Sequence, residues 1–270
     1  MKRIAAVFGV LFMLVLVSCN QGMPSPHLDN NLTLQVVRSS ASELIDALSS
    51  DGIEVQWDSA RIAQDSGGTR IDLATNEESI TLVGYLNNDG DLATLFVRVR
   101  PSDDKVIVAD YVSGFVQGYE VKGDPAAIGV SANVPPLEEA PIDIQSTSVV
   151  NTLVTIQKRF SSQGPPTIKS YNHGGIAPQV TCWELRRELQ DARRDRDRAR
   201  RDYDLAIVAT AAAIAAEALA CGSLNPPACY VAAVAASAAL ANQAAKRADW
   251  LYAKDYYERL QRAYNMSTCV

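Results

Sequence analysis

The sequence predicts an α+β protein made of two parts. The first is a small antiparallel sheet domain with one helix. It is followed by a long antiparallel α-helical hairpin stapled by two disulfides. Short alternating apolar segments, separated by turn residues, fill the first half of the chain. Two long segments of strong helix formers, without internal proline or glycine, fill the end. Four cysteines lie at the ends of these two helical segments, where they would hold the helices together.

Residues 1–18 have the features of an export signal. Two basic residues precede an apolar segment, which is shorter than the roughly 20 residues of a membrane-spanning helix. The tetrapeptide Leu16-Val17-Ser18-Cys19 resembles the lipobox of bacterial lipoproteins. The resemblance implies cleavage before Cys19, attachment of a diacylglyceryl group to its sulfur, and a place in the cell envelope on the extracytoplasmic side of a membrane. Asn20 favours the outer membrane where the host has two membranes, and residues 19–29 are expected to form a tether.

Residues 30–130 are predicted to form a small acidic α+β domain. The segment 42–48 has helical spacing and is followed by a turn pair, Asp51-Gly52. Because only a few turn residues separate consecutive strands, we expect an antiparallel meander with the helix covering one face. The expected strands, several of which alternate between apolar and polar residues, are 53–57, 69–74, 79–86, 92–99, 105–112 and 115–121.

Residues 131–181 are rich in proline and glycine and are predicted to be mostly a linker. Within this segment, residues 149–156 are expected to form one extra strand. A linker of this composition would let the parts of the chain on either side of it move independently.

Residues 182–270 are predicted to form the helical hairpin. The segments 183–220 and 229–265 contain no proline or glycine, and each would be about 55–60 Å long as a helix. Between them, Gly222 suits a left-handed cap at the end of the first helix, and Asn225 suits the N-cap of the second. The short turn requires the two helices to fold back on each other.

The cysteine positions predict how the two helices face each other. Cys19 is used for the lipid, so four cysteines remain, and an even number in an exported protein indicates disulfides. Four cysteines allow three pairings, but facing residues of a hairpin have a nearly constant sum of residue numbers. Cys221 and Cys229 sum to 450 and Cys182 and Cys269 to 451, so these are the two predicted disulfides. A zinc site is not expected, because the four sulfurs would lie at opposite ends of the helices.

The same register predicts an apolar seam in which large side chains meet small ones. It places four pairs opposite each other: Leu185 by Tyr264, Leu189 by Leu260, Ala192 by Tyr257, and Ala199 by Trp250 or Leu251. Arg196 interrupts the seam and is expected to reach solvent or an acid such as Asp255. Near the turn both helices are rich in alanine, with 19 alanines in residues 205–245.

Charge is distributed unevenly along the chain, whose formal charge is −6. Residues 182–270 hold 13 basic and 11 acidic residues, so most of the negative charge lies before them. This balance argues against a general nucleic-acid-binding protein. In the segment 186–204, eight arginines are interspersed with acids, which we interpret as a solvated helix face with ion pairs four residues apart. A basic patch for phosphate or anionic lipid is the alternative.

No pattern in the sequence predicts catalysis, a cofactor or a metal site. His173 lies in a glycine-containing loop without a cysteine, aspartate or second histidine at ligand spacing. The segment 87–91 is similar to a calcium loop, but that alignment puts Tyr85 and Phe96 at ligand positions, so we interpret it as a hairpin turn. Sequence signatures of serine hydrolases, phosphate-binding loops and zinc proteases are missing from the chain. We therefore do not expect an enzyme.

These observations favour a membrane-anchored lipoprotein that acts as a non-catalytic binding or scaffolding protein. Its expected partners are the membrane, through the lipid anchor, and a protein that the sequence does not identify; no nucleic acid is expected. The alternative is a membrane-active protein acting through the alanine-rich hairpin, because residues 205–221 and 229–245 would each span about 25 Å as helices. An exported domain followed by a cysteine-framed, alanine-rich helical segment is similar to some bacteriocin precursors.

Overall fold

The computed structural model describes residues 30–121, 137–144, 147–162, 182–222 and 226–266. The chain forms two compact units, Met1–Gln35 and Val36–Val270. In the first unit the described residues are 30–35, which are helical and belong to α2 (Asn30–Ser40), a helix that the sequence pattern did not predict. Everything described below belongs to the second unit.

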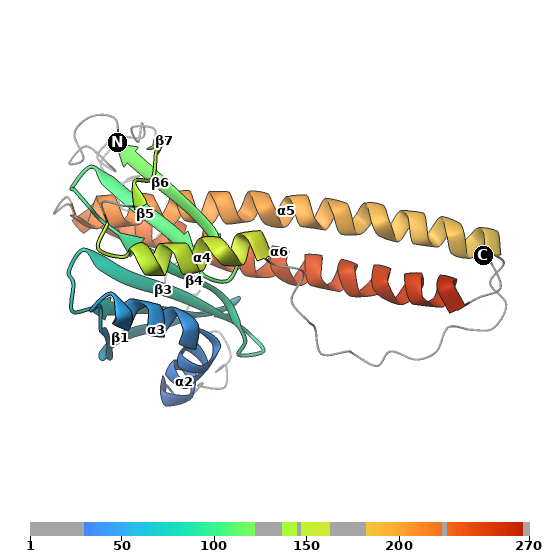
Figure 1. Ribbon diagram of the computed structural model, residues 1–270, viewed down its shortest axis with the longest axis horizontal. Coiled ribbons are helices and arrows are strands. Elements are labelled where there is room, and N and C mark those ends of the chain that lie inside the picture. The colour runs from blue at the N-terminus through green and yellow to red at the C-terminus, as the bar shows by residue number, and fades with distance from the viewer. Residues whose placement is uncertain (1–29, 122–136, 145–146, 163–181, 223–225, 267–270) are drawn as a thin grey trace, which may run out of the picture. The chain divides into compact units, whose positions relative to one another are not determined.

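The sheet has seven strands, and every pairing between neighbouring strands is antiparallel, as the short turns predicted. Spatial order equals chain order, so the sheet is a simple meander (Figure 1). The strands are β1 (Val55–Asp65), β2 (Gly68–Thr75), β3 (Ile80–Asn87), β4 (Leu92–Val99), β5 (Lys105–Asp110), β6 (Phe115–Val121) and β7 (Leu137–Ala140). The first strand is longer than predicted, and β7 lies inside the segment predicted to be a linker.

Both faces of the sheet are covered. Alternation of side chains along the strands gives one face a set of fully buried aliphatic residues that includes Ile71, Leu82 and Leu95. On that side α4 (Val150–Ser162) contacts β5 and β6, and α3 (Ser42–Ser50) contacts α4. The other face contributes both valines and aromatic side chains, which pack against two long helices. These residues are Val83, Tyr85, Phe96, Val106, Val108 and Tyr119.

The prediction of a strand at residues 149–156 is wrong, because nearly all of this segment belongs to the helix α4. Its buried residues Val149, Leu153 and Ile156 recur at intervals of four and three, which is the period of a helix face. The signal that begins the helix comes from elsewhere in the chain. Asp51 accepts hydrogen bonds from the Thr152 backbone N–H and from its hydroxyl, at 3.3 and 3.2 Å, and so serves as a cap.

The predicted helical hairpin is confirmed. Helices α5 (Cys182–Gly222) and α6 (Pro226–Met266) have 41 residues each and run side by side (Figure 1). Their register follows the predicted constant sum near 450. The Thr210 hydroxyl donates to the carbonyl of Ala239 at 3.0 Å, and Arg186 donates to the Tyr264 hydroxyl at 3.0 Å.

The hairpin has two parts with different surroundings. We call residues 205–245 the docked segment, because its side chains share a core with the sheet. We call residues 182–204 and 246–266 the arm, where α5 and α6 pack mainly on each other. The shared core differs from our expectation that the regions on either side of residues 131–181 move independently, since sheet and hairpin belong to one compact unit.

Candidate functional site

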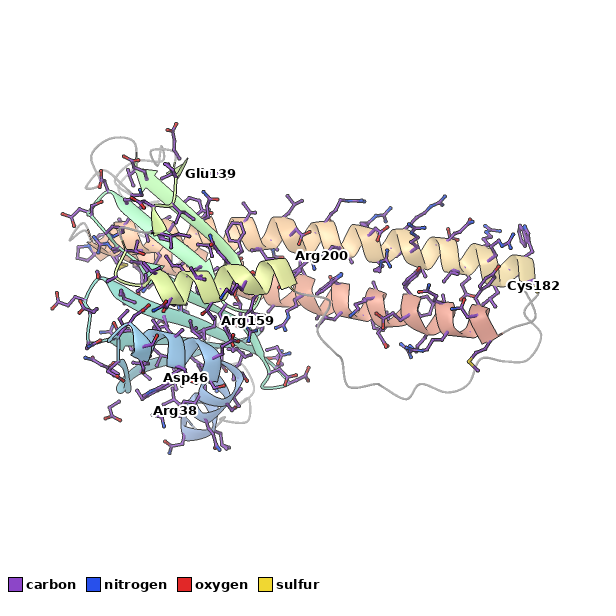
Figure 2. The ribbon with its side chains drawn as sticks, viewed as in Figure 1. Arg38, Asp46, Glu139, Arg159, Cys182 and Arg200 are labelled. Atoms are coloured by element: carbon purple, nitrogen blue, oxygen red, sulfur yellow. A yellow bond between two sulfur atoms is a disulfide. The ribbon has the colours of Figure 1, made fainter. Side chains whose placement is uncertain are left out.

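The structure joins Cys221 and Cys229 in the predicted disulfide, which links the last turn of α5 to the first turn of α6. Cys182, at the start of α5 (Figure 2), is also disulfide-bonded. Its predicted partner Cys269 and the predicted lipidation site Cys19 lie outside the described residues. The Cys182–Cys269 pairing and the lipid anchor therefore stay predictions.

Gly222 has a different role from the predicted left-handed cap. It is the last residue of α5, and its φ is not in the left-handed region. A Cβ at this position would meet the guanidinium group of Arg100, which follows β4 in the chain. Gly222 thus leaves room for a cation near the C-terminal end of α5, where unpaired carbonyls favour positive charge. Asn225, the predicted N-cap of α6, lies outside the described residues.

A buried charge cluster joins the sheet to α5. It consists of Arg70 and Asp72 from β2, Arg98 from β4 and Glu217 from α5. Arg70 lies 2.6 Å from one Glu217 oxygen and 2.8 Å from Asp72, while Arg98 lies 3.4 Å from the other Glu217 oxygen. The side chains of Arg70 and Glu217 are each only 7% exposed. Two positive and two negative charges therefore compensate one another, with Arg70, Arg98 and Glu217 largely removed from water and Asp72 partly exposed.

The strands position this cluster through their two-residue period. Arg70 and Asp72 are two residues apart, so both side chains leave β2 on the face that meets the hairpin. Arg70 also donates to Ser237 of α6 at 2.8 Å, which ties both helices to one strand. Burial lowers the pKa of Arg98, and the charge of Glu217 opposes that change. Burial also acts to lower the pKa of Arg70, but Asp72 and Glu217 raise it overall.

A second polar contact joins the sheet to α6 around Asp110 of β5, which is fully buried. Gln243 of α6 donates to the Asp110 carboxylate at 3.0 Å, and the Thr94 hydroxyl donates to it at 2.8 Å. One turn further along α6, Arg247 donates to two backbone carbonyls at the start of β4, 2.8 and 2.7 Å away. These directional contacts set the position of the hairpin along the sheet, which an alanine surface alone does not specify.

Two apolar clusters along α5 and α6 confirm the predicted seam, one within the arm and one where the arm meets Ile207 of the docked segment and Phe115 of β6. In one cluster, Leu185, Ala192 and Leu260 are buried and Leu189, Tyr257 and Tyr264 pack against them. The next cluster contains Tyr203 and Trp250, whose rings stack with centroids 5.5 Å apart. Burial raises the pKa of the Tyr203 hydroxyl, and the nearby Asp110 charge acts in the same direction.

Arg196 interrupts the seam as predicted, but it does not pair with Asp255. Its guanidinium lies 4.3 Å from the centroid of the Tyr257 ring and 2.6 Å from Asp197. Asp255 instead pairs with Arg259, one turn along α6, at 2.7 Å. A planar guanidinium can stack on an aromatic ring and keep its edge free for a carboxylate, so Arg196 stays beside the seam.

Near the disulfide, α6 exposes three neighbouring large apolar side chains, which we call the α6 patch. Tyr230 is 73% exposed, Val231 is 65% exposed and Val234 is 53% exposed. From Pro226 to Ala245, α6 carries no charged residue, so the helix itself places no charge beside the patch. Exposed apolar side chains in a group, as opposed to scattered ones, are typical of binding surfaces.

Among the described residues, no group of three or more histidine, cysteine, aspartate or glutamate side chains is arranged to hold a metal ion. His27 and His173 lie outside the described residues. Residues 87–91 form the turn between β3 and β4, in which the Asn87 side-chain oxygen accepts from the backbone N–H groups of Asp89 and Asp91. The segment is therefore a hairpin turn, as predicted, and the Asn87 side chain stabilises it.

Both α5 and α6 are long and apolar enough to cross a membrane. The apolar stretch of α5 is mostly buried inside the protein, whereas that of α6 is mostly not. Core helices of soluble proteins meet the same criterion, so length and composition do not by themselves assign a membrane span.

Comparisons with known proteins identify no relative. No family model matches the chain, no curated protein matches it, and no solved structure matches it. Functional assignment therefore depends on the residues and contacts described above.

Sequence reasoning missed the polar contacts between sheet and hairpin. One signal for them was present: Glu217 is the single charged residue in the 41 residues from Leu205 to Ala245, and an acid in such a segment needs a partner. The sequence did not show which partner, because Arg70 and Arg98 lie on strands whose alternation is equally consistent with a solvent-facing arginine. Only the packing of the hairpin on that sheet face decides it.

Proposed function

We propose that the protein is an exported, lipid-anchored, non-catalytic protein that binds a protein partner and acts as a scaffold, with the α6 patch as the contact surface. The observation that carries this proposal is the group of Tyr230, Val231 and Val234, neighbouring apolar side chains of α6 that are each more than half exposed. Burial of large apolar side chains supplies most of the affinity in protein interfaces, and tyrosine is common among the residues that contribute most.

Rigidity of the hairpin supports this role. The Cys221–Cys229 disulfide closes the turn beside the patch, and the buried charge cluster holds the same end of the hairpin on the sheet. A surface that is already ordered loses little conformational entropy when a partner binds. The protein is therefore suited to present a fixed apolar surface.

An envelope location is supported by two features. The tetrapeptide ending at Cys19 resembles a lipobox, and disulfides persist in oxidising compartments outside the cytoplasm. In this proposal residues 1–18 are a signal peptide, Cys19 carries the lipid, and Cys182–Cys269 is a second disulfide.

The test places a photo-crosslinking amino acid at Val231 in the native host, with the same amino acid at Tyr252 as a control. Tyr252 is a similarly exposed residue on the arm. We expect a crosslinked protein of defined mass at Val231 and not at Tyr252, and its yield should fall when Tyr230→Ser and Val234→Ser are introduced. In the same cells, after the membranes are washed with high salt to remove electrostatically bound protein, Cys19→Ser should move the protein from the membrane to the soluble fraction. Absence of any protein adduct at Val231 would overturn the binding proposal, and an unchanged membrane fraction would overturn the anchor.

A second candidate function is membrane activity through the hairpin, which the apolar length of α5 and α6 favours. The position of Glu217 in a buried charge cluster weighs against it, because insertion would have to break ion pairs to Arg70 and Arg98. The mature protein should release dye from liposomes at micromolar concentration if this function is correct. Retention of the dye by both the oxidised and the reduced protein would exclude it.

A further inference from the structure

Arginines on the arm are separated from most acids around the axis of α5. At 100° per residue, six exposed arginines lie within a sector of about 140°, which we call the arginine stripe. Its members are Arg186, Arg187, Arg193, Arg194, Arg198 and Arg201. Five acids lie in a neighbouring sector of about 60°: Glu184, Glu188, Asp191, Asp195 and Asp202. The charges of this part of α5 therefore form two separate sectors, and not the single mixed face that the sequence pattern predicted.

Two acids do lie within the stripe, and both are already paired with arginines outside it. Asp197 contacts Arg196 at 2.6 Å, and Asp204 contacts Arg200 at 3.0 Å. These pairs leave the arginines of the stripe with little neutralising charge.

Among the described residues, most arginines of the stripe have no acidic partner. Within the part of the chain that the structure describes, Arg193, Arg198 and Arg201 form no ion pair or hydrogen bond. Arg194 has a contact to Asp191 at 3.5 Å, and both side chains are largely exposed, so that pair is weak. The stripe extends over about 22 Å from Arg186 to Arg201. It is therefore a row of cations whose charge is available to an external anion.

Apolar side chains lie in the same sector at both ends of the stripe. Trp183 is 67% exposed and stacks with Arg187, whose guanidinium carbon is 5.6 Å from the ring. Leu205 is 70% exposed at the other end. A tryptophan and a leucine flanking a row of arginines match a membrane surface, where the cations meet phosphate headgroups and the apolar side chains enter the boundary with the acyl chains.

We infer that the arginine stripe of α5 is a docking surface for a membrane that exposes anionic phospholipid headgroups. Arginine suits this partner, because its planar guanidinium donates to phosphate oxygens in a bidentate geometry. The region before residue 182 carries most of the negative charge of the chain and is repelled by the same membrane. Charge therefore orients the protein with this face of α5 against the headgroups. The inference goes beyond the proposed function, since it requires neither the α6 patch nor the lipid anchor.

The test uses the mature chain with Cys19→Ser, so that no acyl group contributes to binding. Sedimentation should show partition into vesicles of phosphatidylcholine mixed with phosphatidylglycerol, weak partition into pure phosphatidylcholine, and loss of binding as salt increases. Arg193→Gln with Arg198→Gln should weaken partition about 25-fold, at about fivefold for each arginine near an anionic surface. Arg61→Gln with Arg262→Gln is the matched control, because it removes two exposed arginines outside the stripe and leaves partition nearly unchanged.

A second variant separates a membrane from a soluble polyanion. Trp183→Ala should weaken partition into the anionic vesicles several-fold and leave binding to inorganic polyphosphate unchanged. Circular dichroism of every variant should show the helical content of the parent protein. Three results would each overturn the inference: no partition into anionic vesicles, equal partition into neutral vesicles, or equal loss in the stripe variant and its matched control. Polyphosphate binding that exceeds vesicle binding and is insensitive to Trp183→Ala would also overturn it in favour of a soluble polyanion.

Discussion

The docked segment and the arm belong to the same two helices, yet they are held in different ways. In the docked segment the hairpin offers mainly alanine, and the sheet supplies the large side chains, such as Tyr85, Phe96 and Tyr119. In the arm, large and small residues alternate between the two helices, so α5 and α6 complete each other's packing. A helix surface made of small side chains needs a partner with large side chains to fill the space between the two backbones.

Charge is also used differently in the two regions. The docked segment has one charged side chain, Glu217, and it is buried between two arginines of the sheet. The arm has many charges, and pairs such as Arg200–Asp204 are about half exposed. Buried ion pairs make a structure sensitive to the loss of one member, whereas exposed pairs contribute little. The two regions should therefore respond differently to similar substitutions.

The largest difference is expected for the loss of one carboxylate in each region. Glu217→Gln should lower the free energy of unfolding by about 3–5 kcal/mol, because the buried Arg98 loses its counter-charge and Arg70 keeps only the partly exposed Asp72. Asp204→Asn in the arm should lower it by less than about 0.5 kcal/mol. Urea unfolding of the two variants measures both values. Similar losses in the two variants would show that the buried charge cluster contributes no more to stability than an exposed ion pair of the arm.

Truncation of a buried leucine in each region should produce a smaller difference. Leu240 shares the core with the sheet, and Leu240→Ala should cost about 3–4 kcal/mol in global stability. Leu260 packs in the arm, so Leu260→Ala should mainly accelerate amide exchange in residues 251–266, with about 1–2 kcal/mol of global cost. Hydrogen exchange with mass spectrometry distinguishes local from global opening. Accelerated exchange throughout the sheet in Leu260→Ala would contradict this division.

Removal of the Cys221–Cys229 disulfide tests the docked segment alone. Cys221→Ser with Cys229→Ser should lower the free energy of unfolding by about 2.5 kcal/mol, the amount expected for a short closed loop. Exchange should become faster near the turn, while the arm around Leu185 and Leu260 keeps its protection. Equal loss of protection in the arm would indicate that the hairpin unfolds as one unit.

A small effect is also expected at Tyr119. Its hydroxyl is buried without a hydrogen-bond partner among the described residues, so Tyr119→Phe should change stability at pH 7 by less than about 1 kcal/mol. Burial raises the pKa of Tyr119 from 10.0 to about 12. The folded protein favours the neutral phenol, so this stabilisation is complete below pH 10 and is lost as pH rises toward 12. Unfolding curves should show that Tyr119→Phe is less sensitive to this alkaline range than Tyr252→Phe, which changes an exposed tyrosine of the arm.

Much of the fold followed from local sequence patterns. The bounds of β4 and β6 agree with the predicted segments. The apolar seam between α5 and α6 brings together the residues that the predicted register placed opposite each other. The strand bounds are local features, and the seam depends on one geometric rule, the constant sum of the residue numbers of facing residues in a hairpin. The segment 149–156 was misassigned because valine and isoleucine favour strands, while its cap, Asp51, lies about a hundred residues earlier. No pattern within the segment contains that information.

The sequence by itself determined the antiparallel sheet, the hairpin and the Cys221–Cys229 disulfide, because alternation, helix propensity and spacing act over short distances along the chain. Tertiary structure alone decided that the alanine-rich half of the hairpin covers the sheet and that Glu217 meets Arg70 and Arg98. It also decided which apolar side chains stay exposed, at the α6 patch and at the ends of the arginine stripe. The physical reason is that a buried charge or an uncovered apolar residue is defined by what packs against it, and its partners come from distant strands and helices.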